Sequence, residues 1–298
     1  MIDIVLPYVD CEDPAWQDVF LQAKRLPVKT PRLRELSLRP FRRRFASYGL
    51  FKYWWRALCA NFEGGWRVHL LLMMPSQRPQ WLKDDPRVIL HYHESFLPQG
   101  LRPCFNSSAI ELYAIRSLDL GPRFLLANDD MYFNQPCSAD DFFDGGAPLT
   151  HIAVKGQYGY GTFQCTLENG RCLVSRHYGK PCPAYAYHHL IQAYSTAYCK
   201  GFLEGEWGRI APRLGRFRSA QDYNHLLLMM GQDLSGVSRD SDRYPASGYY
   251  EMPRLKGVPR EALLEHKVIC LNDTDSQGVA QARAYLESRY PAKCPLET

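Results

Sequence analysis

The sequence predicts an α/β fold with a mainly parallel central sheet and flanking helices. Short apolar runs typical of buried strands alternate with segments whose apolar residues recur at helical spacing. The run that begins at Phe124 ends abruptly in Asn128, Asp129 and Asp130, and an apolar segment then resumes. Open α/β sheets bind ligands beyond the carboxyl ends of their strands. With 298 residues, 46% of them hydrophobic, the chain is long enough for one large or two small domains.

The first third of the chain contains three predicted strands and one helix. Residues 2–9, with an apolar run from Ile4 to Val9, predict a first strand that leads into a polar loop at Asp10. Residues 66–74 are nearly all apolar and predict a second strand, and residues 87–93 predict a shorter third one. Between the first two strands an apolar helical stripe is formed by Tyr48, Phe51, Trp55 and Leu58.

The next segment supplies a helix and the strand that ends in acids. Ser108 and Glu111 have the spacing of a capping box, which predicts a helix through Leu118. Gly121 and Pro122 then break the chain before the strand that ends at residue 128. Strand, helix and strand in this order indicate a parallel sheet with crossover helices.

The pattern changes after Gly146, and we expect residues 147–260 to form an insertion or subdomain within a single α/β domain. Glu168-Asn169-Gly170 lies between two short runs and predicts a β-hairpin over residues 162–175. A helix is expected from about Tyr185. Residues 268–271 predict another strand that ends in Asn272 and Asp273, and residues 279–289 predict a closing amphipathic helix.

The net charge of +5 is unevenly distributed. Between Lys24 and Arg44 there are nine Lys and Arg residues and only Glu35 to oppose them, and three prolines predict an extended or loop segment. Such a patch suits an anionic lipid surface, an acidic glycan or nucleic acid, and a solvated basic face is the plain alternative. Aromatic residues interleaved for base stacking are missing, which argues against nucleic acid.

The ten cysteines and the hydropathy pattern indicate a reducing location. The cysteines are scattered without a CxxC pair, so we expect reduced thiols, most of them buried. Cys182, His188, His189 and Cys199 match no common zinc spacing. No run is long and apolar enough for a spanning helix, and the run near the start lacks a cationic leader. The expected location is the cytoplasm.

Acidic residues follow three of the predicted strands, at Asp10, at Asp129 with Asp130, and at Asp273. Each alone is typical of a turn. Together they predict a carboxylate-lined cleft where Mg²⁺ (or Mn²⁺) and substrate phosphates meet, because Mg²⁺ binds through one or two carboxylates plus phosphate oxygens. Glycosyltransferases of the common nucleotide-sugar fold use a similar acidic pair.

Four segments, in order along nearly the whole chain, carry a resemblance to a known family. The first is IDIVLPYVD at 2–10, continued by DPAW at 13–16. The second combines PQWL at 79–82, HESF at 93–96, FNSSAIE at 105–111, NDD at 128–130 and DFF at 141–143. The third is His188 or His189 with RFRS at 216–219 and Asp222, and the fourth is ICLND at 269–273. This set resembles the Stealth proteins, sugar-1-phosphate transferases that include bacterial capsule polymerases and the lysosomal-enzyme GlcNAc-1-phosphotransferase.

The chain departs from the family pattern at three places. Where the family usually has Arg-Asp-x-Gly-Glu, this chain has RFASYGL at 44–50, and only Lys52 and Arg56 keep basic character there. Cys11 replaces a usual Gly, and the residues after His188 lack a usual Pro. These departures concern the acceptor side and the identity of the functional histidine more than the reaction type.

The resemblance implies a nucleotide-sugar transferase fold of GT-A or Rossmann-like type and a specific reaction. A hydroxyl of a glycan or lipid-linked glycan acceptor would attack the phosphorus nearest the sugar of a UDP-sugar, and UMP would leave. The product would be a hexose-1-phosphate joined to the acceptor as a phosphodiester. The implied setting is surface polysaccharide synthesis in the cytoplasm, for capsule or exopolysaccharide, with the basic segment at the inner membrane face.

The resemblance also implies residue roles. Asp129 and Asp130 would hold the metal, and Asp10 would shape the nucleotide pocket. Arg216 and Arg218 would donate to phosphate oxygens, and His188 or His189 would be the base. The implied substrate-binding residues are Lys52, Arg56, Asn106, Ser107, Glu111, Asn128, Asp222, Asn272 and Asp273.

Two alternatives stay open from the sequence. An ordinary glycosyltransferase in the same cleft would release UDP instead of UMP. A non-catalytic carbohydrate-binding protein would use Trp16, Trp81 and Trp207 as stacking platforms for sugar rings. Such a protein has no need of acids at several strand ends, and tryptophans at these positions are more often part of a core.

Overall fold

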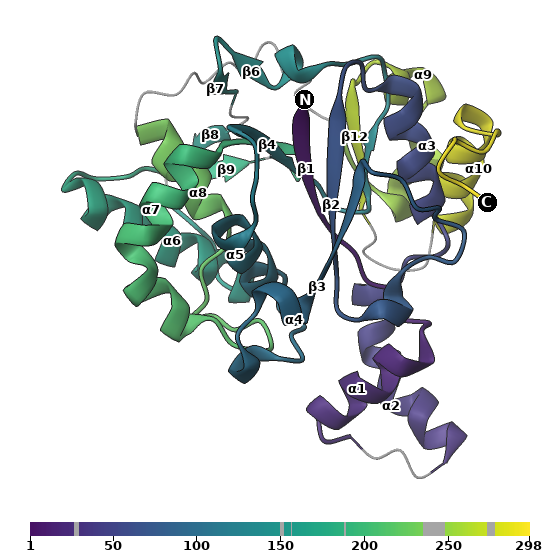
Figure 1. The fold of residues 1–298 in the computed structure, drawn as a ribbon, viewed down its shortest axis with the longest axis horizontal. Coiled ribbons are helices and arrows are strands. Elements are labelled where there is room, and N and C mark those ends of the chain that lie inside the picture. Colours follow the sequence, from purple (N-terminus) through teal and green to yellow (C-terminus); the bar gives the residue numbers. More distant parts are fainter. Residues whose placement is uncertain (27–29, 150–151, 156, 188, 235–247, 273–277) are drawn as a thin grey trace.

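The fold is described from a computed structural model that covers residues 1–26, 30–149, 152–155, 157–187, 189–234, 248–272 and 278–298. A five-stranded sheet in the order β10-β4-β1-β2-β3 lies at its centre (Figure 1). Four strands are parallel, and β10 joins the edge of β4 in the antiparallel direction. The strands are β1 (Ile2–Pro7), β2 (Trp66–Leu72), β3 (Val88–Tyr92), β4 (Arg123–Leu126) and β10 (Gln192–Ser195). The predicted α/β class with a mainly parallel sheet is confirmed.

Helices cover both faces of this sheet (Figure 1). One face carries α3 (Phe51–Asn61) and α10 (Val279–Arg289), and the other carries α5 (Ser107–Ser117), α6 (Thr162–Tyr178), α7 (Thr196–Ile210) and α8 (Leu226–Leu234). Along β1 the side chains alternate, so Ile4 and Leu6 join the α3 side and Val5 joins the α5 side. Strands buried on both faces are nearly continuous apolar runs, and in β1 the run from Ile4 to Leu6 follows the buried Asp3.

A second, three-stranded sheet adjoins the first. It has the order β11-β12-β5 and consists of β11 (Tyr249–Glu251), β12 (Val268–Asn272) and β5 (Met131–Phe133). Because β5 follows β4 after only four residues, the chain passes from one sheet to the other at residues 127–130. The predicted acids therefore lie at the junction between the two sheets.

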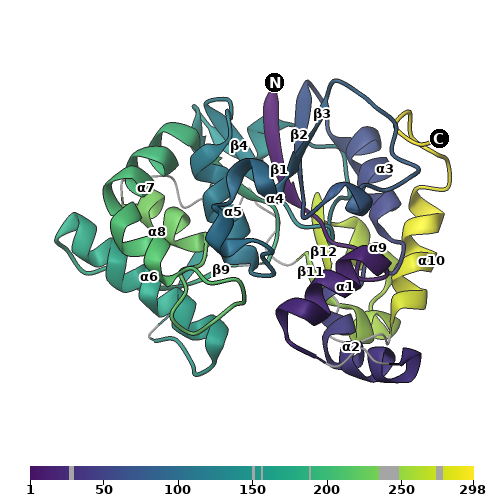
Figure 2. The same cartoon turned by 60° about the horizontal axis from the view of Figure 1, so that its bottom comes forward.

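Two short β-pairs and four further helices complete the described elements. The pairs are β6 (Phe143–Asp144) with β7 (Ala147–Pro148), and β8 (Ile152–Lys155) with β9 (Ala184–Tyr187). The helices are α1 (Pro14–Ala23), α2 (Pro31–Phe45), α4 (His93–Phe96) and α9 (Arg260–Leu264). Helices α1 and α2 lie together beyond the carboxyl end of β1 (Figures 1 and 2).

The basic segment is a helix over much of its length, so the prediction of an extended segment is wrong. Pro31 occupies the first turn, where no backbone N–H is required, and the Thr30 side chain caps that turn. Pro40 lies inside α2 and removes a helical hydrogen bond. Burial of Leu38, with Phe41 packed on Phe20, offsets that loss because it joins α2 to α1.

The predicted hairpin over residues 162–175 is also wrong, because these residues form α6. Gly170 packs against α8 so closely that a Cβ there would lie 3.0 Å from the Cβ of Leu227. The Asn-Gly pair therefore supplies a small residue at a helix contact instead of a turn. The helix expected from Tyr185 is wrong as well: β9 and β10 come first, and α7 begins at Thr196.

Other predictions of local structure hold. The strand over residues 268–271 and the closing helix over 279–289 are present as β12 and α10. All ten cysteines are free thiols, and seven of them are buried. None of the described helices combines the length and apolar composition that crossing a bilayer requires. Segment 147–260 contributes β10 to the central sheet, and its independence as a subdomain stays a prediction.

Candidate active site

A cavity of about 720 Å³ opens at the carboxyl edge of the parallel strands. Residues that directly follow each strand line it: Tyr8 and Val9 after β1, Met73 after β2, His93 after β3, and 128–130 after β4. Strand order reverses between β1 and β4, since β2 and β3 lie on the other side of β1. The cavity therefore occupies the place where open α/β sheets bind their ligands.

Asp129 and Asp130 form the acidic centre of the cavity. Burial, together with the neighbouring charge of Asp130, raises the pKa of Asp129 to about 7. The Oδ1 atom of Asp130 is buried and has no hydrogen-bond partner among the described residues. A buried carboxylate oxygen without a partner is costly. A bound cation would relieve both this cost and the repulsion between the two acids.

His189 and Cys270 surround the other oxygen of Asp130. Oδ2 lies 3.6 Å from Nε2 of His189, in the loop between β9 and β10, and accepts a hydrogen bond from Sγ of Cys270 at 3.4 Å. Burial alone would lower the pKa of His189, but the charge and hydrogen bond of Asp130 outweigh it, so the pKa is raised. The protonated imidazole is therefore favoured beside Asp130.

The side chains around Asp130 could hold a divalent cation. Ligand atoms of Asp130, His189 and Cys270 lie within 4.8 Å of one another, a mixed set that suits a softer ion than Mg²⁺. Burial and the nearby Asp130 charge raise the pKa of the Cys270 thiol well above its usual range, however, and a protonated thiol is a poor ligand. Asp129 and the amide of Asn128 line the cavity beside this group and offer further oxygen ligands, which suit a divalent cation.

A histidine that the sequence did not single out also lines the cavity. Nδ1 of His225 lies 2.6 Å from Oε2 of Glu111, whose side chain is only 4% exposed. Glu111 therefore does not complete a capping box with Ser108, because the helix is capped by Asn106, which accepts from Ser108 N. A carboxylate that holds one ring nitrogen orients an imidazole for proton transfer at the other. No local signal marks His225, since it precedes α8 in an irregular segment.

Arg218 is the arginine that reaches the cavity. Its Nε is buried without a hydrogen-bond partner among the described residues, and its guanidinium lies 5.5 Å from the centre of the Phe163 ring. A guanidinium with unsatisfied donors is suited to phosphate oxygens. Arg216 does not line the cavity, since its exposed Nε donates to the carbonyl of Gly100, so its predicted role is corrected.

Asn106 and Asp222 act on the loop that carries Arg218, not on the cavity itself. Nδ2 of Asn106 donates to Oδ2 of Asp222 at 2.9 Å, and both residues are buried. Asp222 also accepts from the backbone N and Oγ of Ser219. These bonds tie the loop to the start of α5, and neither Asn106 nor Asp222 lines the cavity, as direct substrate contact would require.

Lys52 and Arg56 lie on α3, outside the cavity lining, and their predicted substrate role is corrected. Arg56 forms a buried bidentate ion pair with Glu297, at 2.6 and 2.7 Å, and donates to the carbonyl of Tyr290. It therefore anchors the C-terminal segment on α3. The amine of Lys52 lies 4.9 Å from the centre of the Tyr53 ring.

Asp10 also lies outside the cavity lining, although Tyr8 and Val9 just before it belong to it. The Asp10 carboxylate accepts from the backbone N of Glu12, and its own backbone pairs with the Gln77 carboxamide. Its place in the pocket is therefore taken by Tyr8, and Asp10 forms the turn that follows.

The remaining predicted residues divide into two groups. Ser107, Asn128 and Asn272 line the cavity, and Nδ2 of Asn272 donates to the hydroxyl of Tyr249. His188 and Asp273 lie outside the described residues.

Comparisons with known proteins identify relatives of this chain. Residues 44–149 match the family model of Stealth protein CR2, conserved region 2. The capsular polysaccharide phosphotransferase eps5J of Streptococcus thermophilus is 31% identical over 59% of this chain and 72% of its own length. The exopolysaccharide phosphotransferase cps2G of Lactiplantibacillus plantarum is 31% identical over 60% of this chain, and the match spans half of that relative's length. A capsular polysaccharide phosphotransferase WcwK of Streptococcus pneumoniae is 28% identical over 99% of this chain and 98% of its own.

Among solved structures, the galactosyltransferase LgtC in complex with donor and acceptor sugar analogues aligns over 97% of this chain and 96% of its own. The TM-score is 0.45 at 11% identity.

Proposed function

This chain belongs to the Stealth family of capsule phosphotransferases, and from that premise we propose that it transfers a hexose-1-phosphate from a UDP-sugar to a glycan hydroxyl. The bond between the acceptor oxygen and the phosphorus nearest the sugar forms. The bond between that phosphorus and the bridging oxygen breaks, and UMP leaves. The glycan acceptor, free or lipid-linked, gains a phosphodiester, and its hydroxyl proton passes to a base on the protein.

One observation supports the proposal most strongly. The adjacent carboxylates of Asp129 and Asp130 line a cavity at the point where the strand order of the sheet reverses, and a buried oxygen of Asp130 has no hydrogen-bond partner among the described residues. A diphosphate is repelled by Asp129 and Asp130 unless a cation separates them. A divalent cation held there, Mg²⁺ or Mn²⁺, supplies neutralisation of the diphosphate oxygens. Arg218 and the amides at the start of α5, near Ser107, supply further donors to phosphate.

Two positions offer the base. His188 or His189 is implied by the family resemblance, but the contact with Asp130 favours the protonated form of His189. His225 is oriented by Glu111 through Nδ1, which leaves Nε2 to accept the hydroxyl proton. We propose His225 as the base and His189 as a cationic group near the acids.

The product nucleotide tests the reaction. The protein is incubated with a panel of UDP-sugars, neutral and lipid-linked glycan acceptors and Mg²⁺ or Mn²⁺, and nucleotides are separated by chromatography. Acceptor-dependent UMP supports the proposal. UDP as the product would identify an ordinary glycosyltransferase, and Asp130→Asn serves as the inactive control.

The carbohydrate-binding alternative would use three tryptophans as platforms, and each of them packs against another aromatic ring of the protein. Trp16 is buried, Trp81 packs edge-on against Phe51, and Trp207 packs against Tyr113. A rise in Tm that requires both a UDP-sugar and a divalent cation would favour the enzyme, because ligands that bind the folded protein together stabilise it against unfolding. Protection by a polysaccharide alone would favour the lectin.

We also propose that the enzyme works in the cytoplasm at the inner membrane face. Helix α2 exposes Leu33 and Leu36 beside Arg32 and Arg39. Apolar side chains among exposed arginines suit an anionic lipid surface. Sedimentation with anionic vesicles at two salt concentrations tests this, since binding should weaken at higher salt.

A further inference from the structure

We propose that a second cavity, next to the first, binds the acceptor glycan; this inference rests on the proposed function. The second cavity measures about 770 Å³ and is lined by one side of α6, by residues 157–159 and 182–184, and by Ala220. Tyr158 and Gln164 line both cavities, so the two adjoin at these side chains. A chain bound in the second cavity would therefore lie next to the cavity that contains the acids.

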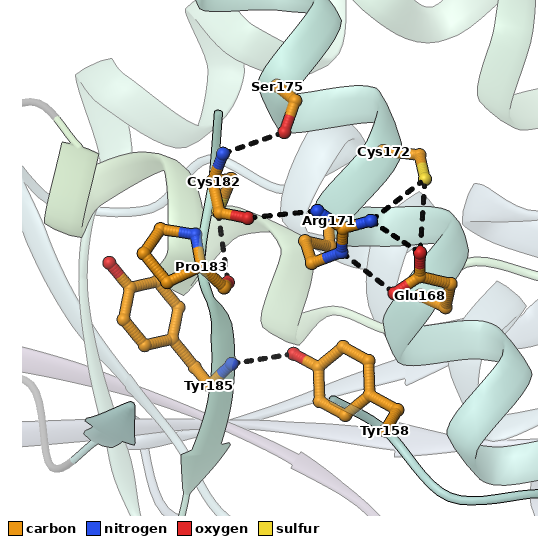
Figure 3. A network of polar contacts seen from close by, with 8 residues as sticks. All are labelled: Tyr158, Glu168, Arg171, Cys172, Ser175, Cys182, Pro183 and Tyr185. Carbon is orange, nitrogen blue, oxygen red and sulfur yellow. Dashed lines mark hydrogen bonds and ion pairs between the residues drawn. The ribbon is translucent and has the colours of Figure 1, made fainter. Parts of the chain in front are cut away.

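The walls of the second cavity are polar but carry no net charge. Among its described lining residues, the guanidinium of Arg171 is the sole cation, and it pairs with both carboxylate oxygens of Glu168 at 2.8 and 2.6 Å (Figure 3). Arg171 also donates to the carbonyl of Cys182 at 3.1 Å. The pKa of Glu168 is lowered, first by its hydrogen bond to Arg171, so both partners stay ionised and cancel. The described lining residues therefore offer a phosphate or a nucleotide no cation that is not already paired with a carboxylate. A neutral ligand rich in hydroxyl groups does not need such a cation.

Hydrogen bonds fix the frame of this cavity. Figure 3 shows Arg171 of α6 directed at Cys182, just before β9, and the hydroxyl of Tyr158 accepting from the backbone N of Tyr185 at 2.9 Å. Nδ2 of Asn169 donates to the carbonyls of Ala220 and Asp222. The loop that carries Arg218 is thereby joined to the wall of the second cavity. A frame held by its own bonds loses little freedom when a ligand binds.

Carboxamides remain available on this frame. Gln157 and Gln164 both line the cavity, and their side chains form no hydrogen bond with another described residue. A carboxamide donates and accepts at once, which matches a sugar hydroxyl that does the same. Pockets for polar ligands depend on a few such groups on a fixed wall.

An exposed aromatic residue directly follows a residue that lines the cavity. Tyr160 is fully exposed, in a short segment between Gly159, which lines the cavity, and Gly161, which precedes α6. The ring of Tyr160 is not covered by any of the described residues. An exposed ring with a polar hydroxyl group is suited to stacking on the C–H face of a sugar. Neutral carboxamides on the wall and an aromatic at the edge together indicate a glycan.

Binding and activity are tested separately. Saturation-transfer NMR is recorded with neutral oligosaccharides of glucose, galactose and N-acetylglucosamine, two to six residues long, on the full chain. We expect at least one to bind, and Tyr160→Ala or Gln157→Ala to weaken it about tenfold. Saturating UDP with Mg²⁺ should not displace it. Gln281→Ala, an exposed glutamine on α10 that lines neither cavity, is the matched control for Gln157→Ala and should leave binding unchanged.

Three outcomes would overturn the inference: no oligosaccharide binds, the two variants bind as well as the unaltered protein, or UDP displaces the sugar. The proposed function fails differently, through absence of acceptor-dependent UMP. If UMP is released, Tyr160→Ala should raise the KM for the acceptor about tenfold and leave the KM for the UDP-sugar within twofold. An unchanged KM for the acceptor would refute the acceptor site without contradicting the proposed reaction.

Discussion

Replacing Asp130 with Asn should separate activity from stability. Asparagine keeps the shape of the side chain and an oxygen for the Cys270 thiol, but removes the negative charge. Burial, and to a smaller extent the charge of Asp130, raises the pKa of Asp129 to about 7. The two acids therefore repel each other in the folded protein. In Asp130→Asn that repulsion disappears, and the pKa of Asp129 should fall.

The magnitudes follow from these contacts. Relief of a repulsive active-site charge typically stabilises a fold by about 0.5–2 kcal/mol. Loss of the contact with His189 cancels only part of this stabilisation, because the His189 side chain is 38% exposed and lies 3.6 Å from Asp130. We therefore expect Tm to be unchanged or up to about 2 °C higher. Loss of a group that stabilises transferring charge costs about 100- to 1,000-fold in kcat.

Cation binding supplies the second readout. In the unaltered protein, Mg²⁺ with a UDP-sugar at about 100 times Kd should stabilise the fold by about 2.7 kcal/mol, which raises Tm by about 5 °C. Asp130→Asn should lose most of that increase. Asp140→Asn, an exposed acid that does not line the cavity, should keep both the increase and the activity.

Thermal unfolding is followed by calorimetry and turnover by UMP release. Near-normal turnover in Asp130→Asn, or full stabilisation by Mg²⁺ and the donor, would remove Asp130 from the mechanism. A large fall in Tm without ligand would show that Asp130 acts mainly in folding.

Three further changes test the fold and the site. His225→Gln should lower kcat about 100-fold, whereas near-normal turnover would return the role of base to His188 or His189. The pKa of Asp3 is lowered: burial raises it, but hydrogen bonds from His69, Arg67 and the Gly121 N–H outweigh burial. The ionised Asp3 carboxylate therefore stabilises the fold above pH ~4, and this stabilisation is lost as the pH falls below that value. Asp3→Asn should lower the free energy of unfolding in urea by about 1–3 kcal/mol at pH 7 and by less at pH 3. An equal loss at both pH values would contradict this. Gly170→Leu should lower Tm by several degrees because its side chain meets Leu227 at the α6–α8 contact, and an unchanged Tm would show that the helices separate freely.

The strand ends were predictable because their signal is local. A buried strand cannot continue into Asn128-Asp129-Asp130, so the break in the apolar run marks the carboxyl edge wherever the sheet forms. The cavity at this edge follows from the parallel order of the strands.

The errors arose where packing overrides local preference. Asn169-Gly170 is typical of a turn, yet Gly170 is required for close contact with α8. Pro40 disfavours a helix, yet burial of Leu38 against α1 stabilises one. Local propensity is worth about 1 kcal/mol for a glycine and about 3 for a proline, and tertiary burial exceeds it.

The sequence by itself determined the order of the strands along the chain, the acids at their ends and the resemblance to a family. Only the tertiary structure decided which polar groups meet: Glu111 with His225, 114 residues apart, and Arg56 with Glu297, 241 apart. The same structure placed Arg218 in the cavity and Arg216 outside it. Burial periodicity is a property of neighbours in the chain, but the partner of a buried charge is set by how distant elements pack, and no local pattern records that.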